Sequence, residues 1–283
     1  MKNKFILLIL SSCTLLFSCQ KEVSNENGGG GNSGNNGTLL VKSVFKSGSD
    51  SSQTTYAYDG SKRLASVSNS GVDAGTPYTN QINLTRNSGG VIQKMSVKSD
   101  QFAQYGIDSL LYNVSYDAGT SRYKYKVFAL NIGFALLKDS VAYEYDAAGK
   151  IVKEREFIDD GTAGGYEEIA KTEYTYSGNN IGTAKYFTYD VPTNTYTLDE
   201  TDTFEYDAKT NALQLGNEAI VIGDVTFYGP NNVSKQTIDV PADPTSNQTR
   251  TTTYTYNSNN RPITATFVTT PGGGSATASF TYQ

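Results

Sequence analysis

The sequence predicts an all-β protein: an antiparallel meander of repeated hairpins that forms a long twisted or partly closed sheet. Tyrosine supplies 21 of the 283 residues, tryptophan is absent, and glycine reaches 27 residues. This composition, which is also rich in threonine, serine and asparagine, favours strands and turns over helices. Pairs of aromatic residues separated by one residue recur along the chain. Their spacing of about 28 residues lies within the range that indicates repeat architectures.

Each repeat has the features of a β-hairpin. The clearest copy, residues 143–152, reads YEYDAAGKIV. Its two tyrosine rings point to one face of a strand, the segment from Asp146 turns the chain, and Ile151 begins the returning strand. Related copies occupy residues 56–64, 174–181, 204–213 and 254–263, with degenerate copies at 82–87, 114–117 and 225–232 and half a repeat at 280–282. Because an isolated hairpin is only marginally stable, we expect the hairpins to pair edge to edge and bury the shared aromatic row.

These copies resemble the YD repeats of RHS-type proteins and of small YD-repeat-like lipoproteins of Bacteroidota, many of unknown function. The resemblance covers Tyr56 to Tyr282 loosely and is close only in the copy at Tyr143, where Tyr-Asp, Gly-Lys and Ile are all present. It implies a β-hairpin repeat fold. RHS proteins use many more units to enclose a toxic cargo. With about eight units and no cargo domain, this chain is not expected to enclose one.

Residues 1–18 have the pattern of a secretory signal peptide. Lys2 and Lys4 precede an apolar stretch that is shorter than the roughly 20 residues of a membrane-spanning helix. The end of this segment, Leu16-Phe17-Ser18-Cys19, resembles the lipobox of bacterial lipoproteins, whose cysteine thiol takes a diacylglyceryl group. An ordinary secretory signal with a chance cysteine is the alternative. We therefore expect Cys19 to be lipidated and its acyl chains, such as palmitate, to anchor the protein to the membrane.

The mature chain is expected to contain a tether and one domain. Residues 19–37 carry the lipidated cysteine and a Gly/Asn/Ser-rich segment with almost nothing to bury, which predicts a flexible tether. Residues 38–283 have no comparable linker and predict a single β-repeat domain. Gln20-Lys21-Glu22 resembles the short export tag of surface lipoproteins of Bacteroidota. This tag favours the cell surface over the periplasmic face of the outer membrane.

Composition excludes several classes of function. There is no histidine, and both cysteines lie in the first 19 residues, so neither a catalytic triad nor a histidine or cysteine metal site can form in the domain. We expect no metal and no cofactor. Without Lys2 and Lys4, the mature chain has 21 basic and 28 acidic residues, a net charge of −7. A nucleic-acid partner is not expected at that charge.

Two groups of residues are candidate sites. The first is a set of tyrosines that could stack on a ligand, with packing in the sheet core as the favoured alternative: Tyr143, Tyr145, Tyr174, Tyr176, Tyr254 and Tyr256. The second is a set of acidic clusters at Asp159-Asp160, Glu167-Glu168 and Asp199-Glu200-Thr201-Asp202. Such acids could serve glycoside hydrolysis or bind calcium, but solvated surface charges are the favoured interpretation.

The sequence therefore predicts a membrane-anchored cell-envelope lipoprotein whose β-repeat domain is a non-enzymatic binding or structural module. Its partners would be the membrane, through Cys19, and a glycan or protein ligand. Two alternatives stay open: a carbohydrate-binding surface lipoprotein of a glycan uptake system, and a carboxylate-based glycosidase. The glycosidase would need two facing carboxyl groups about 5 to 10 Å apart.

Overall fold

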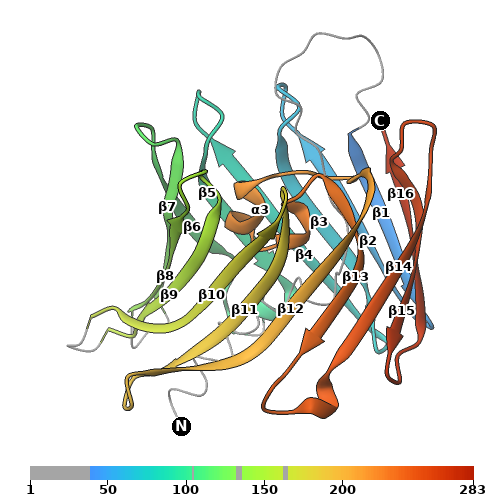
Figure 1. Ribbon diagram of the computed structural model, residues 1–283. Helices are drawn as coiled ribbons and strands as arrows, with labels where there is room; N and C mark the ends of the chain where they lie inside the picture. The colour runs from blue at the N-terminus through green and yellow to red at the C-terminus, as the bar shows by residue number, and fades with distance from the viewer. Residues whose placement is uncertain (1–38, 104, 132–135, 162–164) are drawn as a thin grey trace.

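The chain forms a closed antiparallel β-barrel (Figure 1). The computed structural model describes residues 39–103, 105–131, 136–161 and 165–283. The signal peptide, Cys19 and the tether up to residue 37 lie outside the described residues. The predicted all-β antiparallel meander is confirmed, but the prediction of a twisted or only partly closed sheet is wrong. The sheet closes because the first strand of the described chain pairs with the last.

Sixteen strands make up the barrel within the described ranges. They are β1 Leu40–Ser47, β2 Asp50–Tyr58, β3 Leu64–Asp73, β4 Thr76–Arg86, β5 Ile92–Ser99, β6 Leu110–Asp117, β7 Arg122–Asn131, β8 Leu136–Tyr145, β9 Ile151–Asp159, β10 Glu167–Ser177, β11 Asn180–Asp190, β12 Thr195–Thr210, β13 Asn231–Asp239, β14 Gln248–Tyr256, β15 Pro262–Thr270 and β16 Ser275–Tyr282. The short helices are α2 Asp100–Ala103, α3 Asn217–Ile222, η1 Val225–Phe227 and η2 Pro244–Ser246. None of the described helices is long and apolar enough to cross a membrane.

The repeated turns share one hydrogen-bonding pattern. In the hairpin between β8 and β9, Asp146 donates its backbone N–H to the carbonyl of Lys150, and its carboxylate accepts the Lys150 N–H at 2.9 Å. Gly149, with φ of 83°, provides the left-handed residue that this turn needs. The same two bonds recur from Asp59 to Arg63, from Asn87 to Val91 and from Asn257 to Arg261. An Asp or Asn thus sets the turn of four hairpins, after an aromatic pair in three of them and after the aliphatic residues Ile82 and Leu84 in the fourth.

Alternation along the strands separates an outward row from an inward row of side chains. On β14, Thr251, Thr253 and Thr255 are exposed, whereas Thr252 between them is buried. The exposed outward residues on β2, β5, β14, β15 and β16 include Gln53, Thr55, Lys94, Lys98, Thr251, Thr253, Thr255, Thr264, Thr266, Thr277, Ser279 and Thr281. The inward row carries the buried core, for example Ala265 and Phe267 on β15. The barrel is therefore polar outside and largely apolar inside.

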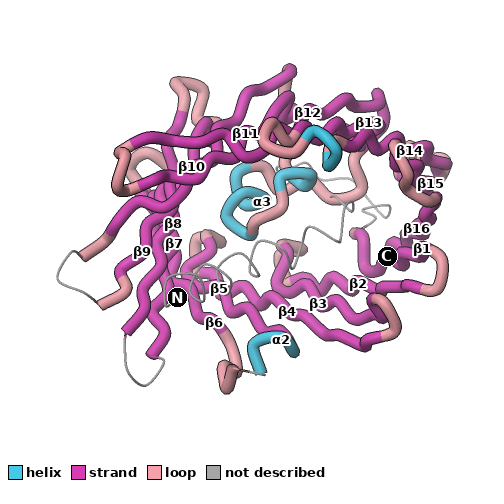
Figure 2. Tube along the Cα trace, turned by 90° about the horizontal axis from the view of Figure 1, so that it is seen from below, coloured by secondary structure: helices cyan, strands magenta, loops and turns pink. Residues whose placement is uncertain are grey.

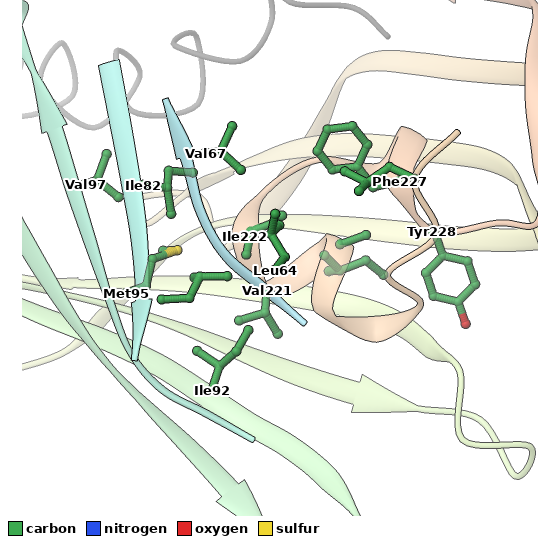
Figure 3. Close-up of a cluster of buried hydrophobic side chains, with 14 of the residues drawn as sticks. Leu64, Val67, Ile82, Ile92, Met95, Val97, Val221, Ile222, Phe227 and Tyr228 are labelled. Atoms are coloured by element: carbon green, nitrogen blue, oxygen red, sulfur yellow. The ribbon is translucent and has the colours of Figure 1, made fainter. Parts of the chain in front are cut away.

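A segment between β12 and β13 folds into the barrel, and we call residues 211–230 the plug. Figure 2 shows its helix α3 within the ring of strands. The base of the plug closes where the Asn211 N–H donates to the carbonyl of Pro230 at 2.8 Å. Ile220, Val221 and Ile222 of α3 are buried. In Figure 3 the labelled plug residues lie beside apolar side chains of the wall, among them Leu64, Ile92 and Met95.

The plug is held to the wall by a partly buried ion pair. Both oxygens of the Glu218 carboxylate accept hydrogen bonds from Arg86 of β4, at 2.6 and 2.8 Å. Only 7% of the Arg86 side chain is exposed. Tyr123 donates its hydroxyl to Glu218 at 2.9 Å, and Lys126 donates to the carbonyl of Val221 at 3.0 Å. Together with the bond from the Asn217 amide to the carbonyl of Gly149, these polar bonds orient a helix whose other contacts with the wall are apolar.

The plug replaces two of the predicted repeat copies. The copy at residues 204–213 does not turn into a neighbouring strand, because β12 continues to Thr210 and the chain then enters the plug. The degenerate copy at residues 225–232 begins as the short helix η1 and reaches a strand only at Asn231. For these two copies the hairpin prediction is wrong. Both copies run into the same insertion, the plug, which packs inside the barrel.

We predict that Arg86→Ala lowers the free energy of unfolding by about 3 kcal/mol, because it leaves the Glu218 carboxylate in the barrel without its main partner. Urea denaturation of the full chain measures the change. The matched control is Lys235→Ala, which removes an ion pair with Glu205 whose side chains are 41% and 61% exposed. That variant should lose less than about 1 kcal/mol. Equal losses in the two variants would contradict the anchoring role of Arg86.

Candidate functional site

All six tyrosines of the predicted stacking set lie at the ends of strands that lead into turns. Tyr143 and Tyr174 are buried, Tyr145, Tyr176 and Tyr254 are half-buried and pack against the core, and Tyr256 is half-buried. Tyr145 donates its hydroxyl to the carbonyl of Tyr123 at 2.7 Å, one hairpin away. The second aromatic residue of other repeats does the same: Tyr58 to Leu40, Tyr176 to Ile151, Tyr206 to Ile181 and Tyr282 to Pro262.

These hydroxyl bonds connect successive hairpins, so the repeat has a structural role in the barrel. The rings supply apolar contact in the core, and their hydroxyls satisfy carbonyl groups at the beginning of the neighbouring hairpin. Tyr254 donates in the same way to Val233 at 3.0 Å, and Tyr256 donates to the Asp207 carboxylate. Stacking of these tyrosines on a ligand stays a prediction. In the structure, most of these rings pack in or against the barrel core.

An unexpected group of carboxyls lies on the inward row of β8 and β9, and we call it the carboxylate strip (Asp139, Glu154 and Glu156). Asp139 is 3% exposed and shares a hydrogen bond with Glu156. Burial, together with the neighbouring Glu156 charge, raises the pKa of Asp139 well above its usual range. Burial also raises the pKa of Glu156. The two carboxyls therefore share a proton more readily than two solvated acids would.

Glu154 extends the strip toward the tyrosines. It accepts the hydroxyl of Tyr174 from β10, and burial raises its pKa while Lys126 opposes that rise. Tyr143 pairs directly with Glu154 across the β8–β9 ladder. The Tyr143 side chain is buried, and its hydroxyl oxygen has no hydrogen-bond partner. Glu154 and Glu156 stay partly exposed although they face inward, so the interior is not sealed at this level.

The acidic clusters predicted from the sequence do not belong to the carboxylate strip. Asp159 forms an ion pair with Lys138 at 2.7 Å, and Glu168 is paired with Arg155. In the third cluster, Asp202 is buried and accepts from Gln236 at 2.9 Å, whereas Asp199 is exposed. The first two clusters lie on adjacent strands, because Glu167 pairs with Ile158 next to Asp159, whereas the third lies on β12. Asp139 and Glu156 touch, which is closer than the separation of about 5 Å or more that glycosidase carboxyls require.

Sequence reasoning missed the carboxylate strip, although one signal for it was present. The inward row of β8 consists of every second residue of the strand. All of these residues are apolar or aromatic except Asp139, which stands between Leu137 and Val141. A single acid in such a row indicates a buried charge. Glu154 and Glu156 carry no comparable signal, because they alternate with Lys153 and Arg155. Only the tertiary structure shows which of these two faces is inside.

A second feature is a groove of about 430 Å³ between the wall and the α2 segment. Its polar wall follows facing positions on four strands: Thr55, Ser68, Gln81 and Lys98. The other side is formed by Asp100, Ala103, Ile107 and Asp108. The Asp100 carboxylate accepts the N–H and hydroxyl of Thr79 at 2.6 and 2.8 Å, which fixes α2 against β4. The groove thus offers hydroxyl and amide groups on the outside of the barrel.

Comparison with known proteins supports the fold. No family model matches the chain, and no curated protein matches it in sequence. The chain is similar to a porin-like protein from Bacteroides uniformis ATCC 8492, with 12% identity and a TM-score of 0.54 over 86% of this chain and 98% of that one. It is also similar to a porin-like protein from Bacteroides vulgatus ATCC 8482, with 9% identity and a TM-score of 0.52 over 87% and 99%.

At these identities the likeness shows a shared barrel fold and nothing further about function. It extends over nearly the full length of both neighbours. The resemblances to bacterial lipoproteins and to YD repeats, which rest on the residues alone, stay predictions.

We predict that Tyr145→Phe lowers the free energy of unfolding by about 1 kcal/mol, because the carbonyl of Tyr123 loses its donor. Thermal or urea unfolding followed by circular dichroism measures this effect. The control is Tyr125→Phe, since Tyr125 is 43% exposed on the neighbouring strand β7 and should change stability by less than about 0.5 kcal/mol. A Tyr145→Phe variant as stable as the control would show that the hydroxyl bonds do not hold the hairpins together.

Proposed function

We propose that this chain is a lipid-anchored cell-envelope protein whose barrel works as a non-enzymatic binding module in the aqueous phase. The observation that carries the proposal is the polar outward row of the barrel. Threonine, serine, glutamine and lysine occupy exposed outward positions on β2, β5, β14, β15 and β16. The exposed large apolar residues are spread over several strands, for example Leu111 on β6, Tyr125 on β7 and Val268 on β15, and scattered apolar residues are normal on a water-facing surface.

A barrel embedded in lipid has the opposite pattern. Its outer face carries an apolar band about 25 Å tall with aromatic girdles, and its interior is polar. Here the exposed Lys94 and Lys98 project from the outer face of β5, while Met95 and Val97 point inward. Exposing these lysines to lipid would be unfavourable. The printed name "porin-like" describes the neighbouring proteins, and the polar wall of this chain supports a different setting for the same fold.

The lipid anchor is the second part of the proposal. Acylation of Cys19 would attach the protein to the outer membrane, and residues 19–37 would hold the barrel away from the lipid surface. Gln20-Lys21-Glu22 favours the outer, surface-exposed side. In this arrangement the membrane is a partner only through the acyl chains. The barrel itself is free to meet a glycan or protein ligand in the surrounding water.

A carbohydrate-binding role, as part of a glycan uptake system, is the second candidate. The groove beside α2 favours it, because its volume of about 430 Å³ is lined by hydroxyl, amide and charged side chains. Such groups can hydrogen-bond sugar hydroxyls. The groove lies on the outer wall, so an anchored barrel would present it to a soluble glycan.

The test is the variant Cys19→Ser. We predict that it leaves the membrane fraction and stays soluble and folded without detergent, because the acyl chains alone hold a water-soluble barrel at the membrane. Fractionation, mass spectrometry of the N-terminus and circular dichroism measure these three properties. The control is Ser33→Ala in the tether, which should remain with the membrane. Acylation that persists in Cys19→Ser, or a released barrel that aggregates unless detergent is added, would overturn the proposal.

A further inference from the structure

We propose that the carboxylate strip and Tyr143 bind the ammonium group of a small aliphatic amine inside the barrel. The inference rests on the proposed role as a binding module and names the ligand class of that module. Three carboxyls, Asp139, Glu154 and Glu156, share one face of two adjacent strands. Such a concentration of carboxyls inside a protein is costly unless a cation or a proton accompanies it.

The unpartnered hydroxyl of Tyr143 points independently to a ligand. Only 7% of Tyr143 is exposed, and its hydroxyl oxygen has no partner. A buried polar group left in this state costs about 1 to 3 kcal/mol. Tyr143 faces Glu154 across the ladder and also lies near Asp139. A group that donates hydrogen bonds at this position would satisfy the tyrosine oxygen and the carboxylates together.

An ammonium group fits these acceptors. It has three N–H donors and one positive charge, which matches the hydroxyl oxygen of Tyr143 and the free lone pairs of Glu154 and Glu156. The resident cation, Lys126, already donates to the carbonyl of Val221 at 3.0 Å. It therefore serves the plug as well as the strip. A second cation would complete the charge balance.

The surroundings favour an organic amine over a bare ion. Tyr174 donates its hydroxyl to Glu154, and Tyr186 follows on the adjacent strand β11. Aromatic faces beside a carboxylate attract an alkylammonium both by apolar contact and by the cation–π interaction. Glu154, Glu156 and Tyr186 remain partly exposed on the inward row, so a short alkyl chain can reach the strip from the barrel interior.

Binding should couple to protons, because burial raises the pKa of the strip carboxyls. A bound ammonium favours their ionised form, so binding strengthens as the pH rises through their raised pKa values and weakens below them. The groups that face or influence the strip, element by element, are Lys126 from β7, Asp139 and Tyr143 from β8, Glu154 and Glu156 from β9, Tyr174 from β10, Tyr186 from β11, Glu200 and Asp202 from β12, and Asp224 from the plug.

The test is calorimetric titration of the full chain with 1,4-diaminobutane. We expect saturable binding that weakens at least about tenfold in Glu154→Gln and several-fold in Tyr143→Phe, since each loses a hydrogen bond to a charged group. The matched control is Glu144→Gln, which removes an exposed outward carboxylate from the same strand as Tyr143. It should bind as the wild type does. At equal ionic strength, neither potassium chloride nor sodium chloride should displace the amine.

Tyr143→Phe keeps the test decisive even if Glu154→Gln does not fold. Because the hydroxyl has no partner in the protein, its removal should leave the unfolding midpoint unchanged or raise it while weakening the amine. If Tyr143 had only a structural role, its replacement would lower the unfolding midpoint and leave amine binding unchanged. No saturable binding to the folded wild type, equal weakening in Glu144→Gln, or displacement by potassium would overturn the amine site. None of these results would alter the behaviour of Cys19→Ser. The proposal of a lipid-anchored module is therefore tested independently of the amine site.

Discussion

Six residue pairs join β1 to β16, from Leu40–Tyr282 to Lys46–Thr277, and two further backbone bonds at 2.9 Å join Leu39 to Gln283. This pairing removes both edges of the sheet, which would otherwise expose unpaired N–H and C=O groups. It also gives every strand an inner and an outer face. The tyrosine rings, the plug and the carboxylate strip are all inside only because the sheet closes.

A closed sheet of this size must fill its interior, and the chain does so in two ways. At one level the plug supplies Ile220, Val221 and Ile222, anchored through Arg86 and Glu218. At another level the inward row becomes polar and carries Asp139, Glu154 and Glu156, whose pKa values are raised by burial. The first level is packed as a protein core. The second has the character of a binding site, since it retains acidic groups and a tyrosine oxygen without a partner.

Local sequence was sufficient to predict the hairpins but not their closure. The aromatic pair followed by Asp or Asn acts within ten residues, as in Tyr143 to Val152, and its turn is formed by bonds within that segment. Closure depends on β1, which contains no aromatic pair and resembles any other amphipathic strand. The plug was missed because Phe204 to Leu213 has the pattern of another repeat, and the bonds of the buried Asn211 to Gly229 and Pro230 join residues about twenty positions apart. Glu154 and Glu156 of β9 were not singled out, because closure of the sheet decides which face of β9 lies inside.

The most direct test of closure is a disulfide between the first and last strands. Val44 and Ser279 face each other across the β1–β16 ladder, at the Cα separation of about 4.5 to 5.5 Å that a disulfide accepts. In a chain with Cys13 and Cys19 replaced by serine, Val44→Cys with Ser279→Cys should form an intramolecular disulfide in the folded monomer. Val44→Cys with Thr203→Cys, on β12, should not. An open sheet would leave the first pair reduced or linked only between molecules, and that result would contradict the closed barrel.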